Sequence, residues 1–167
     1  LDLPTTTEQV QAALRQIGIS SDNPQGLFIS GYFAEEEKRF AIPYNMVLAS
    51  NVDALNFLAA QLETLSAGER AELNAALQAP QSELFSIGRI TDFPENVDYY
   101  VHLPDVRGPA QLGDYYLNRS GMVDMPDEWK GGINTAQFGR FVAQQEQGAF
   151  TQYGYLVKSG DAWQKVH

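Results

Sequence analysis

The sequence predicts a mixed α+β protein made of three consecutive units. These are an N-terminal α/β unit over residues 1–49, a bundle of short helices over residues 50–95, and a mixed α+β unit over residues 96–167. Helical spacing of apolar residues in the middle of the chain, and strand-forming segments before and after it, predict this order. At 167 residues and 44% hydrophobic, the chain can bury a core of one compact domain or of two to three small subdomains.

The N-terminal unit is expected to combine one helix with extended segments. Thr5 and Glu8 are spaced as a capping box, in which Thr5 accepts from a backbone N–H and Glu8 reaches back. Apolar residues then recur at helical spacing until Gly18, which we expect to end the helix in a left-handed conformation. Residues 27–33 are rich in strand formers, and residues 40–42 resume extended structure, so this unit should contain a strand.

The sequence pattern of the central unit predicts a series of short helices. Asp53 is the expected N-cap of one helix, and Ser66 with Glu69 forms the capping box of the next, which ends before a proline. Residues 81–93 supply a further helix. Helices this short are marginal in water, so they must be stabilised by packing on each other.

The last unit mixes strands and helices. Residues 97–103 alternate at period two and predict a half-buried strand with its odd-numbered residues on the buried face. Pro109 opens a helix that Gly121 ends, and Asn134 caps the following helix. Residues 149–157 return as a strand.

Negative charge is concentrated in the middle of the chain. The net charge is −10, and residues 53–128 hold thirteen acidic and four basic residues, whereas residues 129–167 hold two acidic and four basic residues. Such a field repels nucleic acid and anionic membranes and attracts basic surfaces. We therefore expect a protein partner, no direct nucleic-acid ligand and no membrane. Solubility explains an acidic excess equally well.

Motifs for catalysis and cofactor binding are missing from the sequence. It contains no G-x-S-x-G, no G-x-G-x-x-G, no P-loop and no cysteine. This predicts a binding or inhibitory protein without a cofactor rather than an enzyme. A hydrolase that uses an unassigned carboxylate pair stays open as an alternative, because any acidic protein offers such pairs.

Asp98, His102 and Asp105 could form an acid-base or metal-ligand cluster. In a strand, however, Asp98 and His102 lie about 13 Å apart by rise, which argues against shared ligation. We expect these residues to be solvent-facing polar side chains and the protein to hold no metal.

Targeting signals are also missing. The chain has no run of about 18 apolar residues that could span a bilayer. The residues after Leu1 lack the basic and apolar regions of a signal peptide, so we expect none here. Because the chain begins with Leu rather than Met, we expect the natural N-terminus to precede Leu1. The absence of cysteine fits a reducing compartment, and we expect a cytoplasmic protein.

Residues 112–156, LGDYYLNRSGMVDMPDEWKGGINTAQFGRFVAQQEQGAFTQYGYL, carry an ordered set of motifs. A helix with paired tyrosines leads to a glycine, then a proline-containing link, a helix ending in Gly-Arg, and a Gly-aromatic strand. These motifs are Tyr115-Tyr116, Gly121, Pro126, Gly139-Arg140 and Gly148-Ala149-Phe150. This order resembles the carboxy-terminal part of ArdA-type antirestriction proteins. The stretch LNFLAAQLETLSAGERAELNAAL looks like the middle domain of that family, so the resemblance covers about residues 50–157.

The resemblance implies an elongated, three-part α+β protein carried by a mobile genetic element. It also implies a dimer that mimics bent duplex DNA and thereby occupies type I restriction-modification enzymes. Duplex DNA carries one charge per ~1.7 Å of axis, so a mimic must repeat carboxylates closely along a long surface. The acidic residues of the central part of the chain fit this requirement, and mimicry needs no catalytic group.

On this basis we predict two sets of functional residues. The DNA-mimic acidic surface comprises Asp92, Glu95, Asp98, Asp105, Asp114, Asp124, Asp127 and Glu128. The neutral aromatic segment that follows is interpreted as scaffold or dimer contact, with possible interface residues Trp129, Phe138, Arg140, Phe150 and Tyr153.

An alternative function is a non-catalytic protein-interaction module of a mobile element that keeps the fold without DNA mimicry. In that case the aromatic and Gln-rich surface around Trp129 and Tyr153 binds a different partner, and the complex is insensitive to salt. DNA mimicry predicts the opposite, because attraction between exposed charges is screened by salt.

Overall fold

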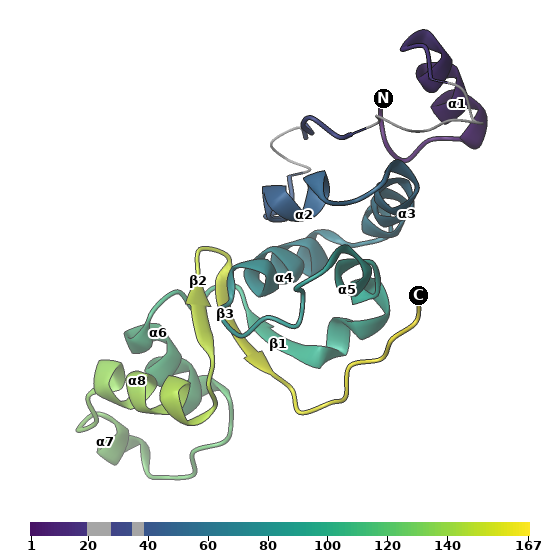
Figure 1. Ribbon diagram of the computed structural model, residues 1–167. Helices are drawn as coiled ribbons and strands as arrows, with labels where there is room; N and C mark the ends of the chain where they lie inside the picture. Colours follow the sequence, from purple (N-terminus) through teal and green to yellow (C-terminus); the bar gives the residue numbers. More distant parts are fainter. Residues whose placement is uncertain (20–27, 35–38) are drawn as a thin grey trace.

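Figure 1 shows the computed structural model, which describes residues 1–19, 28–34 and 39–167. The described residues combine helices with one antiparallel sheet of three strands, which confirms the predicted α+β class. In chain order the elements are α1 (Thr7–Gln16), α2 (Tyr44–Leu48), α3 (Val52–Glu63), α4 (Ala67–Gln78), α5 (Ile87–Thr91), the 3₁₀ helix η2 (Phe93–Tyr99), β1 (Tyr100–Leu103), α6 (Pro109–Asp114), the π-helical turn η3 (Tyr115–Arg119), α7 (Asp127–Lys130), α8 (Thr135–Gln145), β2 (Ala149–Thr151) and β3 (Gly154–Lys158).

The elements are strung out along the molecule in Figure 1. Helices α1, α2 and α3 lie at one end, α4, α5 and the sheet lie in the middle, and α6, α7 and α8 lie at the other end. The C-terminal segment runs back from β3 to the side of α5. The division into units at residues 49/50 and 95/96 stays a prediction.

The sheet is covered on both faces, because neighbouring residues of a strand point to opposite sides. β3 lies between β1 and β2 and pairs antiparallel with both. Leu156 of β3 belongs to one buried cluster, whereas Tyr155 and Val157 belong to another. The single strand predicted over 149–157 is therefore wrong, since a turn at residues 152–153 divides it into β2 and β3.

The first core cluster lies between α3, α4 and α5 and one face of the sheet. Leu73, Ile90 and Phe93 are fully buried there. Burial of apolar side chains contributes roughly 25 cal/mol per Å², and this packing stabilises helices that are too short to persist alone. The other buried members are Leu58, Leu62, Leu65, Ala75, Ala76, Leu84, Tyr100 and Leu156.

The second core cluster is smaller and lies on the opposite face of the sheet. Its buried members are Val106, Leu112 and Tyr155. Helices α6 and α8 cover this face, and half-buried residues such as Phe150 and Val142 pack around the cluster.

Local helix signals were partly correct. The capping box of Ser66 and Glu69 is confirmed, and Asn134 caps α8 through a 2.9 Å hydrogen bond from a backbone N–H. Gly121 has a φ of 70° after the η3 turn, as expected for a helix end. The N-cap of α1 is Thr6 rather than Thr5, and Asn51 rather than Asp53 caps α3. The first shift is by one residue and the second by two, and in both cases nearby residues offered equivalent side-chain acceptors.

The N-terminal strands are wrong in the described part of the chain. Residues 28–33 and 40–42 form no strand, and residue 27 lies outside the described residues. Side chains bind these backbones instead of a neighbouring strand. The hydroxyl of Tyr32 donates to the carbonyl of residue 42 at 3.2 Å, and Asn74 Oδ1 accepts from the N–H of Ala41 at 2.7 Å.

Two further predictions fail before the sheet. The helix predicted over 81–93 is reduced to α5, which begins after the N-cap Ser86. The strand predicted over 97–103 begins only at Tyr100, since Pro94 opens the 3₁₀ helix η2. Tyr100 is 6% exposed and Val101 is 44% exposed, which reverses the expected faces. The reason is that the first core cluster covers the side of Tyr100.

Candidate protein-binding surface

Five of the eight predicted acids have exposed side chains that make no ion pair with another described residue. Glu95 and Asp98 lie in η2, Asp105 follows β1, Asp124 precedes α7, and Glu128 lies in α7. These elements run from the middle of the molecule to the end at α7 (Figure 1). Exposed carboxylates of this kind attract a basic partner, and the attraction weakens as salt is added.

Two predicted acids have a basic neighbour a few residues further along the chain. Arg119 Nη2 lies 3.5 Å from Asp114 Oδ2, and Lys130 Nζ lies 2.9 Å from Asp127 Oδ1. Surface pairs of this kind add little stability. Each pair places a cation beside a carboxylate, so Asp114 and Asp127 contribute less negative potential than the unpaired acids.

Asp92 does not belong to the exposed surface, so its inclusion was wrong. Its side chain is 2% exposed. Asp92 Oδ1 accepts from the backbone N–H groups of Val166 at 3.3 Å and His167 at 2.8 Å, and His167 Nδ1 lies 3.2 Å away. Asn96 binds the same segment, because its side chain exchanges two hydrogen bonds with the backbone of Gln164. Asp92 therefore holds the C-terminal segment against α5 and η2.

Glu72 of α4 is a carboxylate that the sequence analysis did not single out, and it lies near Glu69 of α4 and Asp98 of η2. Burial raises the pKa of Glu72 to about 8, with smaller contributions from the charges of Glu69 and Asp98. Glu72 Oε1 is buried and has no hydrogen-bond partner among the described residues. Glu72 is therefore mainly protonated at neutral pH, and the charge of this region comes from its two neighbours.

The predicted interface residues differ in exposure. Trp129 is 69% exposed and Arg140 is exposed, so both are available to a partner. Phe138 is half-buried. Phe150 is half-buried and packs on Tyr155 with ring centroids 4.8 Å apart, whereas Tyr153 packs against the first core cluster. Their role at an interface stays a prediction.

The Gly-Arg motif lies at the middle of α8 and not at the end of a helix as expected, and its glycine has a packing role. A Cβ on Gly139 would lie 1.8 Å from the carbonyl oxygen of Pro109, and a Cβ on Gly113 would lie 1.9 Å from that of Thr135. The backbones of α6 and α8 therefore touch at a pair of glycines. This contact sets the position of Arg140 on the exposed side of α8.

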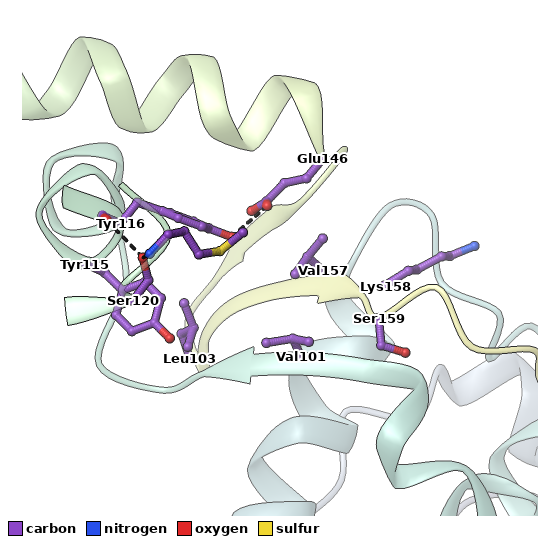
Figure 2. Close-up of a pocket in the computed structure, with 10 residues that line it drawn as sticks. Val101, Leu103, Tyr115, Tyr116, Ser120, Glu146, Val157, Lys158 and Ser159 are labelled. Atoms are coloured by element: carbon purple, nitrogen blue, oxygen red, sulfur yellow. Dashed lines mark hydrogen bonds between the residues drawn. The ribbon is translucent and has the colours of Figure 1, made fainter. Parts of the chain in front are cut away.

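A cavity of about 480 Å³ opens on the second face of the sheet (Figure 2). The strand residues Val101, Leu103 and Val157 form one side of it, and Tyr116 and Glu146 form the other. Glu146 connects the two sides of the second core cluster through hydrogen bonds.

Glu146 accepts a hydrogen bond from a tyrosine at each carboxylate oxygen. The hydroxyl of Tyr116 donates to Oε2 at 2.7 Å, and that of Tyr155 donates to Oε1 at 2.5 Å. Burial raises the pKa of both tyrosines well above the usual value, and the hydrogen bond and charge of Glu146 raise it further. Both hydroxyls therefore keep their protons and act as donors. Sequence reasoning missed this group, although Glu146 is the single acid in residues 129–160.

Metal ligation has no support in the described residues, where no three His, Cys, Asp or Glu side chains gather in a metal-binding arrangement. His102 Nε2 lies 2.8 Å from the carbonyl oxygen of Tyr153, so the ring is engaged within the sheet.

Within the same described parts of the chain, no helix has the length and apolar character required to cross a membrane.

The fold and the exposed acids together indicate the class of protein. It is an acidic α+β protein whose exposed carboxylates suit a basic partner. The chain belongs to the ArdA antirestriction family, because the family model described as "Antirestriction protein (ArdA)" matches residues 1–157 of 167. The match thus includes the first 49 residues, and it ends before Val166 and His167, which Asp92 binds. A search of curated proteins found no match.

Proposed function

We propose that this protein is a non-catalytic antirestriction protein that binds type I restriction-modification enzymes as an acidic mimic of DNA. The proposal rests on family membership and on one observation, the exposed acids that are unpaired among the described residues: Glu95, Asp98, Asp105, Asp124 and Glu128. Their carboxylates stand in for phosphates in the basic DNA-binding groove of the enzyme. Inhibition then requires occupation of the groove and no cofactor.

Charge makes this binding mode strongly dependent on salt. The chain carries a net charge of −10, and the Debye length is about 10 Å at 0.1 M salt and about 30 Å at 0.01 M. Competition with DNA should therefore be strongest at low salt, as expected for a ligand that binds a groove evolved for phosphates.

A competition assay with purified type I methyltransferase and duplex DNA tests the proposal at two salt concentrations. The test variant changes the five unpaired acids to Asn or Gln. We expect its affinity to fall at least about tenfold at low salt, and less at high salt, since the lost attraction is screened.

A matched control separates the arrangement of the charges from their number. The control variant neutralises five exposed acids in other parts of the chain: Asp2, Glu8, Asp53, Glu63 and Asp161. It has the same net charge as the test variant, and we expect it to retain most of the competition. Equal loss in both variants, or no loss in either, contradicts the proposed surface.

Trp129 favours a second candidate function, a protein-interaction module that does not mimic DNA. Its indole is 69% exposed, and exposed tryptophans often anchor protein interfaces. In this alternative Trp129→Ala abolishes a salt-insensitive complex, whereas the five-acid variant retains it. The same two variants therefore distinguish the alternatives.

We also propose that the protein acts as a homodimer in the cytoplasm, with the segment from Trp129 to Tyr153 at the contact. Sedimentation velocity of the wild type and of Trp129→Ala tests this. A monomeric wild type at micromolar concentration contradicts it.

A further inference from the structure

The geometry points to a binding site for one arginine side chain of the partner enzyme in the cavity beside Glu146. The identity of the partner rests on the proposed function. The chemistry of the site is argued from the residues alone.

Glu146 has acceptor capacity that the protein does not use. A carboxylate offers about four acceptor positions, and the two tyrosine hydroxyls occupy one on each oxygen. The same two bonds hold the carboxylate in a fixed orientation, and Figure 2 shows Glu146 at the cavity wall with the bond from Tyr116. Among ion pairs between described residues, none includes Glu146.

The basic residues beside the cavity are engaged by other acids. Lys158 Nζ lies 2.7 Å from Glu83 Oε1, and Figure 2 shows its ammonium group pointing away from Glu146. Arg119 Nη2 lies 3.5 Å from Asp114 Oδ2. Neither cation lies against Glu146, so the charge of its carboxylate is open to a cation from outside.

The walls of the cavity suit a guanidinium group on an aliphatic stem. The rings of Tyr115 and Tyr116 are nearly perpendicular, with centroids 5.6 Å apart. The guanidinium of Arg119 already lies 5.6 Å from the ring centroid of Tyr115, so that ring attracts this kind of cation. Val101 and Val157 provide an apolar surface for the stem.

Arginine fits these walls better than lysine. Its planar group can donate two parallel hydrogen bonds to a carboxylate and stack on a tyrosine ring, whereas an ammonium group is a compact, strongly hydrated point charge. A volume of about 480 Å³ with an open mouth accommodates one such side chain.

Titration with methylguanidinium tests the site without any enzyme. We expect saturable changes in the backbone amide NMR signals of Ser120, Met122 and Glu146, with dissociation in the millimolar range that a single small cation reaches. N-methylurea has the same shape without the charge, and it should cause none of these changes. Absence of saturation, or equal changes with N-methylurea, overturns the inference.

Two variants tie the binding to Glu146. Glu146→Gln keeps the size of the side chain and removes the charge, and we expect methylguanidinium binding to weaken at least tenfold. Met122→Arg introduces a competing guanidinium at the cavity from a side chain that is 74% exposed, so the fold is not disturbed. It should block the probe even if Glu146→Gln fails to fold. Unchanged binding in either folded variant overturns the site.

The competition assay then separates the site from the proposed function. If the site receives an arginine of the enzyme, Met122→Arg and folded Glu146→Gln should compete with DNA about tenfold less well than the wild type. Variants that compete as well as the wild type overturn the role of the cavity alone. Failure of the wild type itself to compete overturns the proposed function, and with it the assigned partner.

Discussion

The two faces of the central sheet differ in what they bury. On the side of Leu156, side chains of α3, α4 and α5 close an apolar core in which Leu73 is fully buried. On the side of Tyr155, the core is small, the hydroxyls of two tyrosines meet Glu146, and a cavity remains open. Both β1 and β3 supply residues to the two sides.

The two faces of the sheet therefore have different roles: one contributes mainly to stability and the other to binding. The apolar face gains free energy from the area it removes from water. The other face retains a carboxylate and ring surfaces that a partner can reach, and the backbone contact between α6 and α8 keeps these groups in place. We expect substitutions on the two faces to have different consequences.

The largest effect is expected in the apolar core. Leu73→Ala leaves a cavity at a fully buried position and should lower the free energy of unfolding by about 2–5 kcal/mol. Val101→Ala on the other face is the control, because Val101 is 44% exposed, and it should cost less than about 1 kcal/mol. Urea unfolding followed by circular dichroism measures both. Equal losses would remove the distinction between the faces.

A smaller effect is expected at the crossing of α6 and α8. Gly139→Ala forces a Cβ to within 1.8 Å of the Pro109 carbonyl, which neither backbone can relieve without moving, and should cost about 2–3 kcal/mol. Gly68→Ala in α4 is the matched control, since its Cβ meets nothing closer than 4.0 Å. That change should stabilise the protein by about 0.5–1 kcal/mol. Thermal unfolding compares the two, and a neutral Gly139→Ala would contradict the close contact.

The smallest effect is expected at Glu72 and depends on pH. Because burial raises its pKa from 4.5 to about 8, the folded protein binds this proton more tightly than the unfolded chain, and stability is lost as pH rises through that interval. Glu72→Gln removes the loss. It should be nearly neutral at pH 4 and stabilising by about 1–2 kcal/mol at pH 9.

Glu63→Gln on the exposed end of α3 is the control for this measurement, because it makes the same chemical change on the surface. Unfolding by urea at several pH values compares the variants. A gain for Glu72→Gln that does not grow with pH would show that its carboxylate is not destabilised by burial.

Predictions from the sequence were correct where the residues that interact lie within about one helical turn of each other in the chain. Ser66 and Glu69 cap α4, and Gly121 ends a helix, because each interaction joins residues a few positions apart. The threonine run before α1 marked the helix start to within one residue, since Thr5 and Thr6 offer the same hydroxyl. The family resemblance, too, was carried by ordered local motifs, and the family match over residues 1–157 confirms it.

Burial and pairing of side chains could not be predicted from the sequence, because they depend on contacts between segments that are far apart in the chain. Asp92 appeared to be one more surface acid until the C-terminal segment, 74–75 residues further along the chain, placed its backbone N–H groups against it. Glu146 acquires its two tyrosine donors from α6–η3 and β3, and the glycines at positions 113 and 139 meet only because α6 and α8 cross. Caps and turns follow from short-range hydrogen bonds, whereas the accessible carboxylates depend on which segments cover one another in the folded chain.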